Sequence, residues 1–128
     1  MALSGSVSGI DHIVVNAPDP LVLVDWYVDK LGLRAERVEE FRRGEVFFPS
    51  VRIDDTTIID VFPTERTGEN LNHFCLVVEG GDVAAIAQDP DFEVVDGPDR
   101  RWGARGDGLS VYVLDPLGNT VELRSYEA

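Results

Sequence analysis

The chain contains only two histidines, and both lie at matching positions of a repeated pattern. His12 follows Ile-Asp and His73 follows Leu-Asn, 61 residues later. A carboxylate recurs in the same way, as Asp60 within IIDVF and as Glu122 within TVELR, 62 residues later. A carboxylate buried in apolar surroundings is costly unless it is paired or coordinated. Two imidazoles with one or two carboxylates suit a borderline divalent ion, so these residues predict one site for Fe, Mn, Ni, Co or Zn.

A structural role is the competing interpretation of each of these residues. A single histidine in a strand more often makes a hydrogen bond in the core than binds a metal. Asp60 is the weakest member, because an arginine or backbone donors would also satisfy its carboxylate. The matched positions of both histidines and both carboxylates favour the metal site.

Two similar series of elements position these residues. In the first half, alternation and helical periodicity predict a helix with Asp19 at its start and Gly32 at its end, among four strands. The strands span residues 10–16, 34–40, 45–53 and 56–62, and the helix spans residues 21–31. In the second half, strands are predicted at 72–78, 92–96, 110–115 and 120–125, a helix at 82–88, a loop at 97–109 and a turn at 116–119.

Each half therefore follows a β-α-β-β-β order, as expected for an internal duplication. The sequence predicts an α+β protein with modules at residues 9–65 and 70–126 inside a single domain, 1–128.

Charge and composition exclude several classes of protein. Eleven Lys and Arg against 24 Asp and Glu give a net charge of −13, which argues against nucleic acid and anionic membranes as partners. The single cysteine, Cys75, excludes an internal disulfide framework. There is no apolar run of membrane-spanning length and no signal-peptide pattern at the start of the sequence. We expect a cytoplasmic protein.

The sequence resembles the vicinal oxygen chelate superfamily, which includes glyoxalase I, methylmalonyl-CoA epimerase, fosfomycin-resistance thiol transferases, extradiol dioxygenases and bleomycin-resistance proteins. The resemblance covers nearly the whole chain and rests on GIDHI at 9–13, WY at 26–27, LGL at 31–33, LNH at 71–73 and SVYVLDPLGNTVEL at 110–123. Leu117 departs from the usual DPDGN form of the last motif.

The resemblance implies paired βαβββ modules whose mixed sheet curls around a metal cleft. It also implies that His12, His73 and Glu122 are the three metal ligands. Asp60 matches the fourth ligand position, where glyoxalase I has the longer Glu, so Asp60 is predicted to act directly, through water or as a base. Tyr112, ten residues before Glu122, matches a tyrosine near the metal in two of these families, although an ordinary strand aromatic is the alternative.

Other residues are expected near the substrate. Period-2 alternation places Asn16 with His12, Cys75 with His73, and Arg124 with Glu122. Arg124 is predicted either to hold a substrate carboxylate or to neutralise Asp60, whereas Cys75 is expected to be a small buried core residue. The glycine-rich loop 97–109 is interpreted as a lid over an anionic substrate or as a solvated connection; its candidates are Arg100, Arg101, Trp102 and Arg105.

The resemblance implies a metal-dependent enzyme of the glyoxalase type, with lyase, isomerase or epimerase chemistry and with Asp60, Glu122 and Tyr112 as catalytic residues. The alternatives are a thiol transferase, a ring-cleaving dioxygenase and a small-molecule binding protein without catalysis. The dioxygenase interpretation is weakened because both histidines are used as ligands, and the transferase interpretation because Val14 replaces a threonine. A homodimer is also expected, because the helix at 21–31 carries more apolar residues than one buried face needs.

Overall fold

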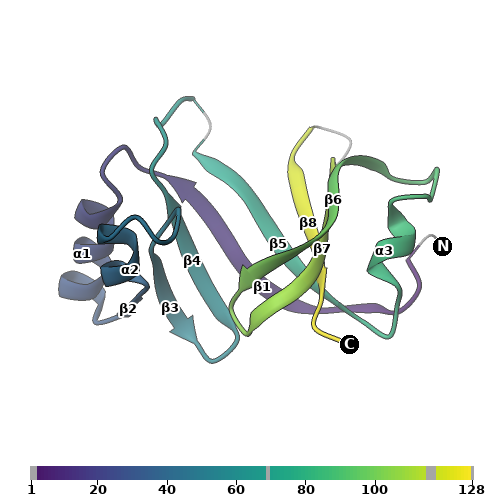
Figure 1. Cartoon of the computed structure of the whole chain (residues 1–128), viewed down its shortest axis with the longest axis horizontal. Coiled ribbons are helices and arrows are strands. Elements are labelled where there is room, and N and C mark those ends of the chain that lie inside the picture. The colour runs from purple at the N-terminus through teal and green to yellow at the C-terminus, as the bar shows by residue number, and fades with distance from the viewer. Residues whose placement is uncertain (1–2, 69, 115–117, 128) are drawn as a thin grey trace. The chain divides into compact units, whose positions relative to one another are not determined.

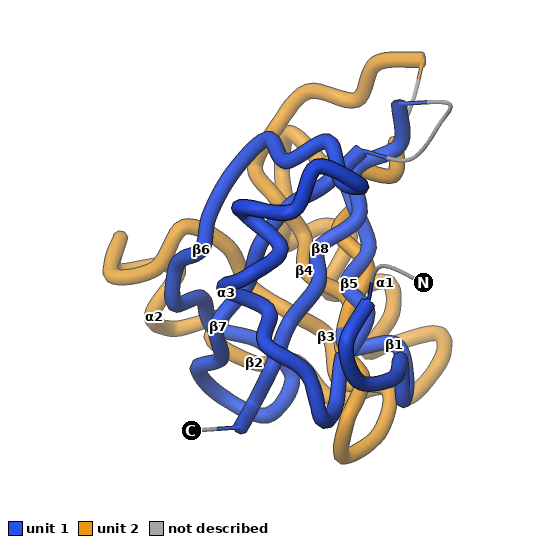
Figure 2. The backbone as a smooth tube through the Cα atoms, turned by 90° about the vertical axis from the view of Figure 1, so that its right-hand side faces the viewer, with its two compact units in different colours: residues 1–11, 73–128 blue, residues 12–72 orange. Residues whose placement is uncertain are grey.

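The computed structural model describes residues 3–68, 70–114 and 118–127, and the chain divides into two compact units (Figures 1 and 2). Unit 2 comprises residues 12–72, and unit 1 comprises residues 1–11 with 73–128. The division falls inside the first strand, between Asp11 and His12. Leu117 and half of the predicted turn at 116–119 lie outside the described residues.

Unit 2 carries a four-stranded mixed sheet with two helices. Its strand order is β2-β3-β4-β1, in which β1 runs parallel to β4 and the other pairs are antiparallel. The elements are β1 (Ser6–Asn16), α1 (Pro20–Leu31), β2 (Arg34–Glu36), α2 (Val38–Arg42), β3 (Ser50–Asp54) and β4 (Thr57–Phe62).

Helix α1 covers one face of the unit 2 sheet (Figure 1). Pro20 occupies its first turn, and Gly32 ends it in the left-handed region with φ 69°. Asp19 stands at the N-cap as predicted, but its side chain makes no capping hydrogen bond. The core contains the buried residues Val24, Val51 and Val61. Since alternate strand residues point to opposite faces, the other face is left to His12, Asp60 and their neighbours.

Unit 1 has the same plan with one short helix. Its strand order is β5-β8-β7-β6, in which β5 runs parallel to β8 and the other pairs are antiparallel. The elements are β5 (Leu71–Glu79), α3 (Val83–Ile86), β6 (Glu93–Gly103), β7 (Gly106–Leu114) and β8 (Thr120–Ser125). The buried core residues are Val78, Val83, Ile86, Val111, Val113 and Leu123.

Two predicted strands of the first half are shorter than expected. The strand predicted at 34–40 ends at Glu36, because Arg37 adopts a left-handed conformation with φ 63° and α2 follows. The strand predicted at 45–53 begins only at Ser50. Pro49 precedes it, and proline has no N–H to donate to a sheet.

The predicted loop at 97–109 was wrong: β6 and β7 form a hairpin over this stretch. Its glycines allow close approach rather than flexibility. Gly97 has φ 89° at a register shift, and a Cβ there would lie 2.6 Å from the Ser110 carbonyl oxygen. A Cβ on Gly103 would lie 2.2 Å from an Arg124 guanidinium nitrogen.

The structure confirms the α+β class and the repeated order of elements, with α2 as an addition in the first half. The curling of the modules around a shared cleft stays a prediction. Among the described residues, no helix is long and apolar enough to cross a membrane.

Candidate functional site

Unit 2 brings His12, Asp60 and Ser50 together on the sheet face opposite α1. Because β1 and β4 are parallel, Val14 pairs with Asp60 and His12 lies one pleat away. His12 Nε2 lies 3.8 Å from Asp60 Oδ2, and Ser50 Oγ donates a hydrogen bond of 2.6 Å to Asp60 Oδ1. All three side chains are buried.

Unit 1 repeats this arrangement with His73, Glu122 and Ser110. Cys75 pairs with Glu122 across the parallel strands β5 and β8, so His73 again lies one pleat away. His73 Nε2 lies 3.1 Å from Glu122 Oε1, and Ser110 Oγ donates a hydrogen bond of 2.7 Å to Glu122 Oε2. The two serines come from different register positions, since Tyr112 rather than Ser110 pairs with Glu122.

We call each of these groups of one histidine, one carboxylate and one serine a half-site. In both half-sites, the two oxygens of the carboxylate have different partners. A serine hydroxyl holds one oxygen, and the other oxygen lies near a histidine Nε2. An imidazole nitrogen beside a carboxylate oxygen is a ligand pair that borderline divalent ions accept, and a hydrogen bond to the second oxygen orients such a ligand. Each unit therefore supplies donor groups of the kind that a divalent metal ion accepts.

Arg124 is fully buried beside Glu122 in unit 1. Its guanidinium donates to Glu122 Oε2 at 3.1 Å and 3.3 Å, and to the carbonyls of Trp102 at 3.1 Å and Gly106 at 3.2 Å. Burial is the largest single effect on Arg124 and disfavours the charged guanidinium. The combined Coulombic effects of Glu122, Cys75, Tyr126 and Asp11 outweigh burial and raise the pKa of Arg124. In unit 1, the carboxylate partner of Arg124 is thus Glu122. The role of Arg124 as a substrate contact stays a prediction.

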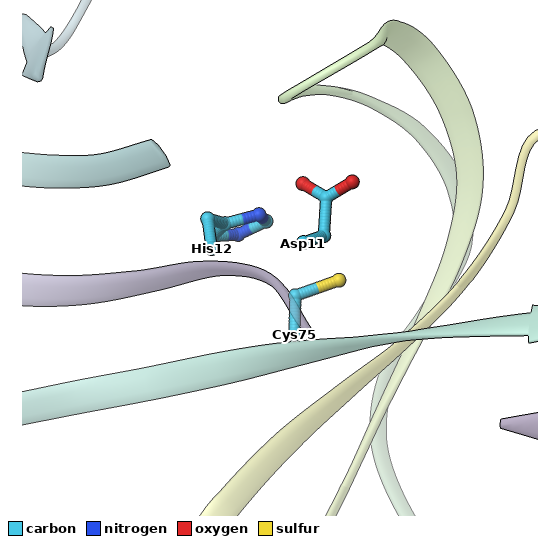
Figure 3. A group of neighbouring side chains, drawn as sticks. All are labelled: Asp11, His12 and Cys75. Atoms are coloured by element: carbon cyan, nitrogen blue, oxygen red, sulfur yellow. The ribbon is translucent and has the colours of Figure 1, made fainter. Parts of the chain in front are cut away.

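Asp11 anchors the β6–β7 hairpin from the strand residue before His12. Its carboxylate accepts hydrogen bonds from the Ala104 N–H at 2.9 Å and from the Tyr126 hydroxyl. One of its oxygens lies within 4.8 Å of the Cys75 thiol in the same unit (Figure 3). Partial burial and the hydrogen bond to Asp11 raise the pKa of Tyr126. Cys75 is fully buried, in agreement with its expected place in the core.

Tyr112 links the hairpin to the second half-site. Its ring packs edge-on against His73, with centroids 5.3 Å apart. Burial, followed by the neighbouring Glu122 carboxylate, raises the pKa of Tyr112. Arg101 interacts with the Tyr112 hydroxyl and also lies 3.4 Å from carboxylate oxygens of Asp96 and Asp99.

The remaining predicted substrate contacts lie in different places. Arg100 is exposed on β6, and Trp102 is half-buried. Arg105 is exposed at the hairpin turn, with its guanidinium 4.3 Å from the centroid of the Tyr126 ring. Asn16 lies in unit 2, on the same strand face as His12.

Sequence reasoning missed the hydroxyl and carboxyl groups that orient the site. Ser50 and Ser110 carry no motif of their own, and their distances of ten and twelve residues from the carboxylates have meaning only once the strand register is known. Asp11 was available as a signal, because an acidic residue beside a candidate ligand is often a supporting group.

A family model described as the Glyoxalase/Bleomycin resistance protein/Dioxygenase superfamily matches residues 9–123. The glyoxalase domain-containing protein RDO1 of Mycosarcoma maydis is 27% identical over 138 aligned residues, covering 95% of this chain and 70% of that protein. The virulence protein STM3117 of Salmonella typhimurium is 24% identical, covering 94% of this chain and 85% of that protein.

Solved structures share the fold. The Mn(II)-bound glyoxalase from Novosphingobium aromaticivorans gives a TM-score of 0.72 at 22% identity over 94% of this chain, which spans only 38% of that protein's length. A Streptomyces coelicolor methylmalonyl-CoA epimerase in complex with 2-nitronate-propionyl-CoA gives 0.66 at 23% identity, covering 96% of this chain and 100% of the epimerase.

Proposed function

Because the chain belongs to the Glyoxalase/Bleomycin resistance protein/Dioxygenase superfamily, we propose that it is a divalent-metal-dependent enzyme of the glyoxalase type. The reaction would move a proton on the carbon next to a carbonyl of a small oxygenated substrate, as lyases, isomerases and epimerases of this type do. The observation that carries this proposal is the pair of matched histidine–carboxylate half-sites, each with a serine on one carboxylate oxygen.

In this proposal His12, His73 and Glu122 hold one Fe, Mn, Ni, Co or Zn ion. When bound, the ion supplies positive charge that polarises the substrate oxygens and stabilises the negative charge that develops on them. Arg124 and Ser110 hold Glu122 Oε2, and this leaves Oε1 oriented toward the His73 side. Glu122 is thereby fixed as an ionised ligand before substrate arrives.

Asp60 acts as the general base. Ser50 fixes Asp60 Oδ1, so the other oxygen, Oδ2, is the one that takes the proton from carbon and returns it. Tyr112 is placed beside Glu122 and His73, and its raised pKa keeps the hydroxyl protonated as a hydrogen-bond donor. Arg101, Arg105, Trp102, Arg124 and Asn16 are the proposed substrate contacts.

Metal analysis of protein purified without chelator or affinity tag tests the ligand set. We expect His12→Ala and His73→Ala to abolish stoichiometric metal binding and Glu122→Gln to weaken it by more than the 10–100-fold typical of supporting groups. Glu93→Gln, an exposed carboxylate on β6, is the matched control and should retain the metal. Unchanged metal content in both histidine variants would refute the site.

Deuterium exchange tests the reaction class. Metal-loaded protein in heavy water is offered 2-oxoaldehyde–thiol adducts, acyl thioesters and 2-hydroxy ketones. Deuterium should appear next to the carbonyl with the wild type, and Asp60→Asn should keep the metal but lose at least about 100-fold in rate. Asp55→Asn, at the exposed turn before β4, is the control.

Three other experimental outcomes would each indicate a different function. Oxygen uptake with catechols would indicate a dioxygenase, and thiol addition to an epoxide without exchange would indicate a transferase. No metal, with no activation by any of the five ions, would indicate a small-molecule binding protein.

We also propose that the protein is a homodimer that uses α1. Val22 and Trp26 on this helix are 67% and 49% exposed, and they border an apolar hollow of about 460 Å³. Sedimentation at micromolar concentration should give about twice the chain mass of 14.1 kDa, and a mass near the chain value would contradict the dimer.

A further inference from the structure

The unit 2 sheet face that carries His12 and Asp60 continues into an aromatic region. On β4, Phe62 follows Asp60 by two residues and therefore points to the same face. The Phe62 ring packs against Phe47 and Phe48, with centroids 5.3 Å and 5.0 Å apart. Phe47 is nevertheless 61% exposed, which leaves apolar ring surface beside the half-site.

Arg37 lies over this aromatic region in a strained backbone conformation. Its guanidinium carbon is 4.7 Å from the Phe48 ring centroid, a cation–π arrangement. Its φ of 63° is the only positive φ among the described residues other than glycine. A backbone conformation of this kind is unfavourable. Such conformations are frequent at ligand-binding sites, where they orient a side chain.

Arg37 is a partly buried cation close to three carboxylates. Arg52 donates from two of its guanidinium nitrogens, Nε and Nη2, to the Glu36 carboxylate, and Ser50 donates to Asp60 Oδ1. Burial lowers the pKa of Arg37 and outweighs the raising effects of Asp60, Glu40 and Glu36. A partly buried guanidinium forms charge-assisted hydrogen bonds with a carboxylate or a phosphate.

Asn16 adds an acceptor at the same end of the sheet. It pairs with Phe62 across β1 and β4. Its Oδ1 is buried and has no hydrogen-bond partner among the described residues. A buried acceptor without a donor is costly, and a donor on a ligand would satisfy it.

We propose that Arg37, Phe47, Phe48, Phe62 and Asn16 form a subsite for a flat apolar group that carries a carboxylate or a phosphate. The rings would stack on the flat group, the guanidinium would bind the anion, and Asn16 would accept a hydrogen bond from a hydroxyl or N–H. Under the proposed function, this flat anionic group is the end of the substrate that lies away from the reacting carbon. That assignment rests on the proposed function, whereas binding of the group to the subsite does not.

The test uses metal-free full-length protein, so it stays independent of turnover. Phenylacetate and phenyl phosphate are titrated while the arginine Nε–H and asparagine side-chain signals are followed by NMR. Fragments of this size that fit a site bind with Kd values on the order of 10 mM or below. At least one charged probe should bind about 10-fold more tightly than the neutral phenylacetamide, as expected for a charge-assisted hydrogen bond. Acetate, which lacks the ring, should bind more weakly than phenylacetate.

Variants assign the binding to Arg37. Arg37→Asn removes the charge but tolerates the left-handed conformation, so it should fold and lose at least about 10-fold in affinity. Arg42→Gln, an exposed arginine on α2 paired with Glu39, is the matched control and should bind like the wild type. Arg37→Lys should retain part of the affinity, because it keeps charge without the planar fork.

Four results would overturn the subsite: no binding of either charged probe at about 50 mM, equal binding of phenylacetamide, full affinity in Arg37→Asn, or signal changes at Arg101 and Arg105 instead. Loss of the proposed enzymatic activity with probe binding intact would reject the proposed function and leave the subsite standing.

Discussion

Replacement of Arg124 by methionine tests whether the buried ion pair with Glu122 holds unit 1 together. Arg124 and Glu122 are both completely inaccessible to solvent, so neither charge can be rescued by water. The guanidinium makes two hydrogen bonds to Glu122 and two to the hairpin carbonyls of Trp102 and Gly106. Removing it leaves a buried carboxylate that still accepts a hydrogen bond from Ser110 but has lost its buried cation.

The loss of one partner of a buried pair costs about 3–5 kcal/mol. Domains of this size are stable by about 5–15 kcal/mol, so Arg124→Met should fold but be strongly destabilised. The midpoint of thermal unfolding should fall by roughly 10–20 °C. Urea unfolding of metal-free protein, followed by tryptophan fluorescence, measures the change in the free energy of unfolding.

A double-mutant cycle separates the charge from the packing. Glu122→Gln should recover much of the loss when combined with Arg124→Met, with a coupling energy of about 2 kcal/mol or more. Arg42→Gln breaks an exposed pair with Glu39 and should cost less than about 1 kcal/mol. If Arg124→Met costs less than about 1 kcal/mol, or if the two substitutions are additive, the buried pair is not what stabilises this unit.

Three further predictions follow from individual contacts. Ser50→Ala and Ser110→Ala should each weaken metal affinity about 10–100-fold, measured in competition with a fluorescent chelator. Ser8→Ala, at an exposed position, is the control and should not change the affinity. Wild-type affinity in both Ser50→Ala and Ser110→Ala would show that these hydroxyls do not orient the ligands. Burial raises the pKa of Tyr126, so above pH about 10 the native state keeps a proton that the unfolded state loses. The free energy of unfolding should therefore fall with rising pH in this range, and it should fall less steeply in Tyr126→Phe. Equal slopes of the free energy of unfolding against pH in the two proteins would contradict this. Gly97→Ala should lower the free energy of unfolding by about 1–3 kcal/mol more than Gly106→Ala. Both glycines have φ near 90°, but only at Gly97 would a Cβ lie against Ser110. Equal losses of free energy in urea unfolding would disprove the steric cause.

The sequence was sufficient for the parts of the site that the duplication repeats. His12 with His73 and Asp60 with Glu122 recur at nearly equal offsets, and the parallel pairing of β1 with β4 and of β5 with β8 explains why. Each carboxylate stands opposite the residue two positions after its histidine, Val14 in one unit and Cys75 in the other. The repeat in the sequence is thus a repeat of strand register.

Contacts that depend on register between distant strands were not accessible in this way. Ser110 reaches Glu122 only because β7 lies beside β8, and nothing in the local sequence distinguishes it from other strand serines. Glycine patterns were misleading for the hairpin, because Gly97 and Gly103 serve close backbone and side-chain approach rather than a mobile loop. The conformation of Arg37 could not be predicted, because an arginine rarely adopts a positive φ.

The two half-sites differ in the residues around their carboxylates, and these differences suit the two carboxylates to different roles. The position two residues after Glu122 is Arg124, a buried cation that holds Glu122 ionised. The matching position after Asp60 is Phe62, whose aromatic ring supplies no such charge. A carboxylate fixed by a buried guanidinium suits permanent coordination of a metal ion, because protonation would break the pair. Asp60 accepts a hydrogen bond from the neutral Ser50, and Arg37, a cation that acts on it electrostatically, is only partly buried. Asp60 can therefore gain and release a proton at smaller cost than Glu122, and this is the property that a general base needs. The duplication thus supports the proposal that Glu122 acts as the ligand and Asp60 as the base.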